Sequence, residues 1–355
     1  MDAKLNFNTL KALAARVSLL LKITFLHVFK RSPAAGKQDL QVEFTVNLVR
    51  SFISFEYPLG KTQRSTLKDP SIKGPILMDP CSHRPTAARL AKETAALLDA
   101  LVAYLYLLSP PEGSLHSAVP TILTICHMSP NPTILFHGKD VPLELPAGVA
   151  TSSSFGDIAV SLPSTSRNVH LDYPTPIRDM SQEFKPMPFP DDADWPSSQP
   201  RAELYANADI LTHPFVSPLS GPKEIWKDAP PIFITIGEEL TEDGGTYLAK
   251  KVHEAGGTAV LERFDSMPHC FALIFGDSAA AKRCYRGWAD FCLDAVHGRV
   301  KRTRQALYIH RDGRGTVTKD LSEIGSLSLD EVQRLHICDH QRIRAFKITS
   351  KSVVM

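Results

Sequence analysis

The run PIFITI at residues 231–236 is a continuous apolar, β-rich segment of the kind that is buried in a parallel sheet. After an acidic turn, the pattern predicts a helix from about Gly245 to Ala255, ended by a glycine pair that suits a helix C-cap. Residues 259–264 are predicted to form a second strand, and residues 279–297 a long helix. This alternation of strand and helix is typical of a parallel α/β sheet.

The chain before this region carries weaker signals. The first 35 residues are predicted to form an amphipathic helix that packs on the protein body. Its apolar face consists of Leu10, Leu13, Val17 and Leu20 or Leu21. Residues 36–85 look irregular, with short strands around 42–48, and the pattern predicts a helix at 86–108.

The middle of the chain is rich in proline. Three runs of strand length occur there, at 122–126, 133–136 and 145–151. Seven of the 27 prolines fall between residues 174 and 200, which predicts a long loop. Near the end of the chain, Ser328 and Glu331 match the capping box that opens a last helix.

The composition argues against several classes of protein. The 40 basic and 38 acidic residues give a net charge of +2, so no nucleic-acid partner is expected. The six cysteines are scattered without a C-x-x-C pair, which favours free thiols in a reducing, cytoplasmic compartment over disulfides or a zinc site. The apolar run at 17–29 is shorter than the roughly 20 residues that span a bilayer, so at most a peripheral membrane contact is expected.

Candidate catalytic residues follow the two predicted strands. Reactive side chains of open parallel sheets lie just past the carboxyl ends of the strands. Glu238 in the first loop and His269 in the second, 31 residues later, can therefore meet across adjacent strands. A carboxylate that orients a histidine is the base half of a nucleophilic triad. Glu239 and Glu242 compete with Glu238, and all three also fit a solvated acidic turn that precedes a helix.

A family resemblance extends this argument. The segment 230–257 (PPIFITIGEELTEDGGTYLAKKVHEAGG), followed by MPHCF at 267–271, resembles the C-terminal half of α/β-hydrolase esterases of the hormone-sensitive-lipase type, particularly fungal ones. Stretches at 95–101 and 211–218 are also similar to this group, as is LPAG at 145–148.

The resemblance implies an α/β-hydrolase fold, in which helices flank a mostly parallel central sheet and a small N-terminal helical element acts as a cap. It also implies hydrolysis of a small-molecule carboxylic ester without a cofactor or metal. On this match Glu238 is the acid and His269 the base of a Ser-Glu-His triad. The expected division is an N-terminal segment at 1–60, a hydrolase domain at 61–300 and a C-terminal extension at 301–355.

The nucleophile of that family is not evident. The family needs a G-x-S-x-G elbow and a His-Gly-Gly loop whose N–H groups stabilise the oxyanion, and neither word occurs in the 355 residues. Where the elbow should fall, Ser129 is followed by Pro130, which has no N–H to donate. Ser154 has an N–H donor after it and a glycine two residues on, so it is the candidate nucleophile. Cys126, beside a histidine, is an alternative.

Two hypotheses from different classes follow. The first is a carboxylic-ester hydrolase. The second is a catalytically inactive relative that binds ligands or partners, or a gene product altered near the missing motifs by reading frame or splicing. Because a triad without its nucleophile cannot form an acyl-enzyme, the sequence predicts negligible turnover of p-nitrophenyl acetate and butyrate.

Overall fold

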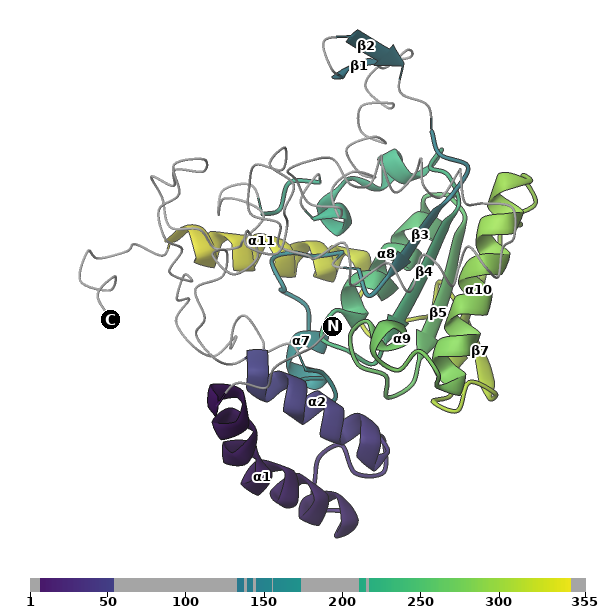
Figure 1. Ribbon diagram of the computed structural model, residues 1–355. Coiled ribbons are helices and arrows are strands. Elements are labelled where there is room, and N and C mark those ends of the chain that lie inside the picture. The colour runs from purple at the N-terminus through teal and green to yellow at the C-terminus, as the bar shows by residue number, and fades with distance from the viewer. Residues whose placement is uncertain are drawn as a thin grey trace.

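The computed structural model describes residues 7–53, 133–136, 139–142, 145–154, 156–173, 211–214 and 217–345 (Figure 1). Its centre is a five-stranded sheet in the order β3-β4-β5-β6-β7. The strands are β3 (Val149–Ser152), β4 (Ile232–Gly237), β5 (Ala259–Phe264), β6 (Gln305–Ile309) and β7 (Thr316–Asp320). The first four pair in parallel and β7 is antiparallel to β6. The mostly parallel sheet expected from the sequence is therefore present.

Alternating side chains of β4 explain why helices cover both faces of the sheet. The two long flanking helices are α8 (Glu242–Glu254) and α10 (Ala279–Val296). Ile236 belongs to the same core cluster as Tyr247 of α8. Side chains alternate along a strand, so Phe233, three residues before Ile236, faces the other side of the sheet. Its ring stacks on Phe291 of α10, with the ring centroids 5.4 Å apart. Figure 1 accordingly shows the two helices on opposite sides of the sheet.

The remaining elements are shorter or lie towards the ends of the chain. They are α1 (Phe7–Val28), α2 (Leu40–Ile53), β1 (Thr133–Phe136), β2 (Lys139–Pro142), α7 (Ser164–Arg167), α9 (Phe271–Ile274) and α11 (Leu329–Ala345), with short 3-10 turns at 218–220 and 223–226. The strand predicted at 133–136 is confirmed as β1, and it pairs antiparallel with β2.

The elements predicted around the PIFITI run are confirmed. The structure has β4, α8, β5 and α10 at the expected places, although α8 begins three residues earlier, at Glu242. Gly256 adopts φ +92°, the left-handed conformation that favours glycine after a helix. The capping box is also confirmed, because the N–H of Glu331 donates to the Ser328 hydroxyl at 3.2 Å. The strand predicted at 145–151 begins only at Val149.

The irregular segment with short strands predicted around 42–48 is wrong, because these residues belong to α2. Asp39 caps the helix by accepting the N–H of Val42 at 2.9 Å. Val42 and Val46 are both buried, one helical turn apart. Their β-branched side chains suggested a strand, but tertiary packing of this face overrides that local preference.

The helix predicted over the first 35 residues is confirmed as α1, but the predicted packing face is wrong in part. Val17 is 51% exposed. Of the two leucines predicted as alternatives, Leu20 is partly buried and Leu21 is 67% exposed, whereas Ile23 is buried. Contacts with α2 decide which face is covered, and the sequence of α1 alone does not contain that information. The side chains of Leu10 and Leu13 lie outside the described residues. So do the predicted helix at 86–108, strand at 122–126 and loop at 174–200.

The α1–α2 hairpin is attached directly to loops at the edge of the sheet. The Gln38 side-chain amide donates to the carbonyl oxygens of Leu171 and Ser266 at 2.7 and 3.0 Å. The Arg50 guanidinium donates to two further carbonyls, those of Val169 and Asp172. Among the described residues, no helix has the length and apolar character needed to cross a membrane.

Candidate active site

The site lies where two neighbouring parallel strands end. Gly237 of β4 pairs with Phe264 of β5, so the loops after both strands leave the same edge of the sheet. A Cβ atom at Gly237 would collide with the carbonyl oxygen of Met267 in the second loop. Glycine is therefore required for the two loops to touch, and their contact brings acidic side chains to the histidine.

His269 faces the carboxylate of Glu239. The imidazole Nδ1 lies 3.5 Å from Oε1 of Glu239, whose side chain is completely buried. The same carboxylate accepts hydrogen bonds from the hydroxyls of Ser153, at 2.9 Å, and Thr241, at 2.5 Å. Glu239 is thus held in one orientation against the imidazole, as an orienting acid must be.

Glu238, the acid predicted from the sequence, has other partners. Its carboxylate binds the Lys37 ammonium at 2.5 Å, the Ser266 N–H at 3.0 Å and the Arg263 guanidinium at 3.5 Å. Burial alone would raise the pKa of Glu238, but Lys37 and Arg263 hold it below its ordinary value. The structure therefore brings Glu239, and not the predicted Glu238, to within 3.5 Å of His269. The cause is electrostatic, because Lys37 and Arg263 both pair with Glu238.

Asp172, which was not predicted from the sequence, connects the two loops from a third segment. Its Oδ1 accepts the N–H of His269 at 2.9 Å, and its Oδ2 accepts the N–H of Leu240 at 2.8 Å. Burial, together with the charge of Glu239, raises the pKa of Asp172 to about 6. No local pattern around Asp172 marks it, because its partners are far away in the sequence.

The acid–histidine cluster also has the composition of a metal site. Ligand atoms of Asp172, Glu239 and His269 all lie within 4.8 Å of one another. However, the oxygens of both carboxylates already accept hydrogen bonds from hydroxyl or backbone donors. These bonds hold the two carboxylates against the histidine in a hydrogen-bonded acid–base cluster.

The charge state of His269 depends on its neighbours. Burial works to lower the pKa of His269, but the Cys270 sulfur and the Glu239 carboxylate outweigh it and raise the pKa well above the ordinary value. Cys270 itself adopts φ +50°, a left-handed conformation that is uncommon for a residue with a side chain. Its N–H donates to the Ser153 hydroxyl at 2.8 Å.

The candidate nucleophile Ser154 is not among the residues that the structure shows bonded to the acid or the histidine. Ser154 is buried and its hydroxyl donates to the Thr151 hydroxyl at 3.4 Å. The adjacent Ser153, at φ +51°, is the serine of the site, but it bridges Glu239 and the Cys270 N–H. Cys126, the alternative, and Ser129, which Pro130 rules out, lie outside the described residues.

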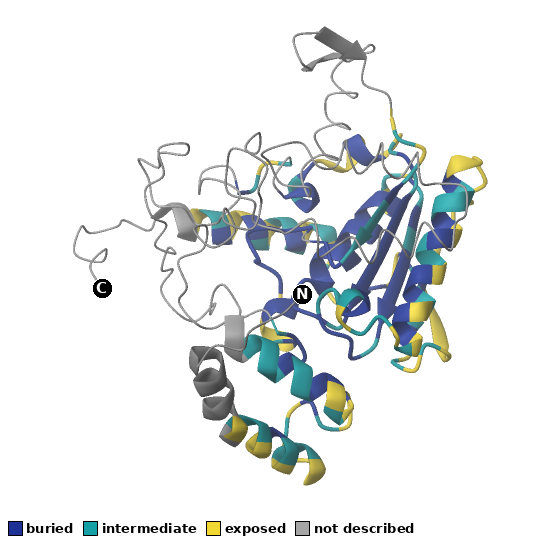
Figure 2. Cartoon of the chain, in the orientation of Figure 1, coloured by how far each residue is buried: buried dark blue, intermediate teal, exposed yellow. Residues whose placement is uncertain are grey.

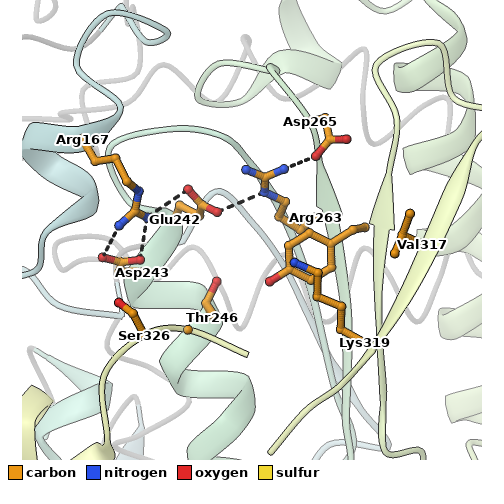
Figure 3. Close-up of a pocket in the computed structure, with 11 residues that line it drawn as sticks. Arg167, Glu242, Asp243, Thr246, Arg263, Asp265, Val317, Lys319 and Ser326 are labelled. Carbon is orange, nitrogen blue, oxygen red and sulfur yellow. Dashed lines mark hydrogen bonds and ion pairs between the residues drawn. The ribbon is translucent and has the colours of Figure 1, made fainter. Parts of the chain in front are cut away.

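A charged cavity of about 430 Å³ is lined by Arg167, Glu242 and Arg263, among other residues (Figure 3). Figure 3 shows Arg167 pointing to Glu242 and Asp243, with the Asp243 oxygen 2.8 Å from the guanidinium. Arg263 reaches the Glu242 carboxylate from β5 at 3.0 Å. This network joins the N-terminus of α8 to β5 and so fixes the loop that carries Glu239. The residues that line the cavity do not include His269.

Comparisons with known proteins agree with this topology. A family model described as an alpha/beta hydrolase fold matches residues 170–273. The protein has the α/β-hydrolase fold. The resemblance found in the sequence is therefore confirmed at the level of the fold. The matched segment contains Asp172, Glu239 and His269, so the site lies within the part of the chain that matches the family model.

Solved structures that are similar to this chain include three esterases or lipases. A hormone-sensitive lipase from a metagenome library is 20% identical, with a TM-score of 0.36, over 52% of this chain and 50% of that one. The chain thus spans about half the length of that relative. An esterase/lipase from an uncultured bacterium is 15% identical, with a TM-score of 0.49, over 73% and 99% of the two chains. An esterase of the bacterial hormone-sensitive lipase family is 15% identical, with a TM-score of 0.48, over 72% and 97%. No curated protein sequence matches the chain.

Proposed function

We propose that this esterase/lipase-like α/β hydrolase binds small-molecule carboxylic esters at the His269 site and hydrolyses them slowly by general-base catalysis. The observation that carries the proposal is the fixed Glu239 carboxylate 3.5 Å from the imidazole of His269, where two parallel strands end. A histidine whose partner carboxylate is itself hydrogen-bonded is the arrangement of a general base.

The reaction follows from what the nearby hydroxyls do. Ser153 is bound to Glu239 and to the N–H of Cys270, and the hydroxyl of Ser154 donates to Thr151. We therefore assign the attacking oxygen to water. His269 removes a proton from water as its oxygen bonds to the ester carbonyl carbon. The imidazolium then returns the proton to the alkoxide as the carbon–oxygen bond to the leaving alcohol breaks.

This chemistry is expected to be slow. Loss of the serine nucleophile costs a serine hydrolase on the order of 10⁶ in kcat. Loss of the oxyanion donors costs about another 10²–10³. The working base is the neutral imidazole, so any turnover should rise with pH through the raised pKa of His269.

The test is hydrolysis of p-nitrophenyl butyrate by the purified full-length protein. We expect turnover close to background that His269→Ala abolishes and His310→Ala leaves unchanged. His310 is a suitable control because it is exposed and pairs with Asp312. A fluorophosphonate probe should not label the protein, since it requires an activated serine.

Two other outcomes would overturn the water mechanism. Fast turnover with probe labelling would show that a serine nucleophile operates, and Ser154→Ala would be the first substitution to make. Hydrolysis that is identical in His269→Ala and in the unchanged protein would favour the second candidate, a non-catalytic relative that binds ligands. The absence of G-x-S-x-G from the sequence is the observation in favour of that candidate.

A further inference from the structure

The outer face of α1 carries a continuous apolar stripe. Its members are Val17, Leu21, Phe25 and Val28, continued by Phe29 just after the helix, and each is 51–67% exposed. The spacing of three and four residues places them on one side of the helix. Figure 2 shows exposed residues along the side of α1 that faces away from α2. The described part of the chain has no other exposed large apolar residues at such spacing.

Basic residues accompany this stripe. Between residues 7 and 38 the chain has six lysines and arginines and no aspartate or glutamate. Lys22, Lys30 and Arg31 are exposed next to the stripe, and no ion pair among the described residues involves them. An apolar face flanked by unpaired cations fits an anionic, apolar layer. A second copy of the same face would bring like charges together.

The helix is fixed in this orientation by its neighbours. The buried Glu43 of α2 binds both His27, near the end of α1, and Ser32 in the following turn. Ile23, on the opposite side from the stripe, is buried. The stripe therefore points outward before any partner arrives, so little ordering is needed on binding.

We propose that the outer face of α1 is an interfacial membrane-binding surface for bilayers that contain anionic phospholipid. The apolar stripe enters the boundary between head groups and acyl chains, as amphipathic helices do at interfaces. Lys22, Lys30 and Arg31 contact the anionic head groups. Each basic residue near an anionic surface strengthens binding about five-fold, and salt weakens this contribution. The proposal does not depend on ester hydrolysis.

The test is co-sedimentation of the full-length protein with phosphatidylcholine vesicles, with and without phosphatidylserine. Binding should require phosphatidylserine and weaken with added salt. A double variant, Leu21→Glu with Phe25→Glu, should bind about tenfold or more weakly. Lys30→Glu with Arg31→Glu should lose the preference for phosphatidylserine. Val317→Glu is the matched control, because Val317 is 61% exposed on β7 and should not affect binding.

Circular dichroism and thermal melting establish that each variant is folded, which is expected because the substituted side chains are exposed. The proposal is overturned if the protein binds neither vesicle, or if Leu21→Glu with Phe25→Glu binds as well as the unchanged chain. It is also overturned if gel filtration shows a dimer that this double variant dissociates. In that case the stripe is an interface between copies.

Discussion

Glu238 and Glu239 are adjacent residues of the same type with different roles in the structure. Glu238 is paired with Lys37 and Arg263. Among the described residues, no lysine or arginine pairs with Glu239, and its oxygens accept two hydroxyl hydrogen bonds and face His269. The position of the cations therefore determines which carboxylate is available to orient the base.

Glutamine substitution separates these two carboxylates. Glu239→Gln removes a charge that raises the pKa of His269, so the pKa should fall towards its ordinary value of about 6.5. Glu238→Gln should change the pKa of His269 much less, since Lys37 and Arg263 already neutralise Glu238. NMR titration of the His269 ring protons measures both effects. An equal fall in the two variants would contradict the assignment of Glu239.

The raised pKa of His269 also predicts how stability depends on pH. A histidine whose folded-state pKa is raised adds stability that is fully present below its unfolded pKa and is lost as pH rises through the folded value. The raised pKa of Asp172, about 6, acts in the same direction, because its protonated form is favoured in the folded protein.

We therefore expect His269→Ala to cost more stability at about pH 5 than at about pH 9. Urea unfolding of the variant and the unchanged protein at both pH values provides the measurement. If the difference between the two proteins were larger at the higher pH, the charged imidazole would not be the stabilising form.

Among the secondary-structure elements, contact between the loops after β4 and β5 depends on Gly237. A methyl group there would meet the Met267 carbonyl, which is backbone and cannot rotate away. Gly156 approaches Gly244 of α8 in the same way, through the Gly244 carbonyl. Both close approaches bring loops together at the edge that holds Glu239 and His269.

Gly237→Ala should therefore destabilise the protein by about 1–3 kcal/mol, the usual cost of overpacking. It should also weaken any His269-dependent activity, because the two loops must separate. Gly315→Ala is the control, since its nearest neighbour is the Cβ of the exposed His310 at 3.2 Å. Urea midpoints compare the variants, and equal midpoints would show that the loops adjust freely.

Across the whole molecule, the helix α11 is bound to the loops beside the central sheet through polar side chains. Nδ1 of His336 lies 3.0 Å from the Ser220 hydroxyl, and its Nε2 lies 3.4 Å from the Asp157 carboxylate. One turn further along, Nδ1 of His340 lies 3.1 Å from the Thr212 hydroxyl. Asp157 also accepts hydrogen bonds from Ser161, so α11 supports the segment after β3.

His336→Ala should lower the free energy of unfolding by about 1–3 kcal/mol, because it leaves buried polar partners unsatisfied. His310→Ala should have little effect, since His310 is exposed. Chemical denaturation of both variants gives the comparison. A result in which the two variants are equally stable would mean that α11 docks mainly through its apolar residues, such as Val332.

Much of the sheet and part of the site could be predicted from the sequence. The runs at 232–237 and 259–264 are apolar and β-rich, and the helices after them have periodic apolar faces and clear ends. These signals are local, and the order of strands and helices follows from them. They also place His269 and an acidic loop at the same edge of the sheet. The strands β6 and β7 were not predicted, because runs of five residues carry little pattern.

The details of the site depend on residues that are distant in the sequence. Lys37, 201 residues before Glu238, pairs with it, and Glu239 is the carboxylate that faces the histidine. Asp172 contacts His269, 97 residues further along the chain, and Ser153 contacts Glu239, 86 residues further along. In the same way, α2 determines which face of α1 is covered. Local patterns determine which elements form, since hydrogen bonding within helices and burial of strands act over a few residues. Charge pairing and side-chain packing act through space, and so they are settled only when distant segments meet.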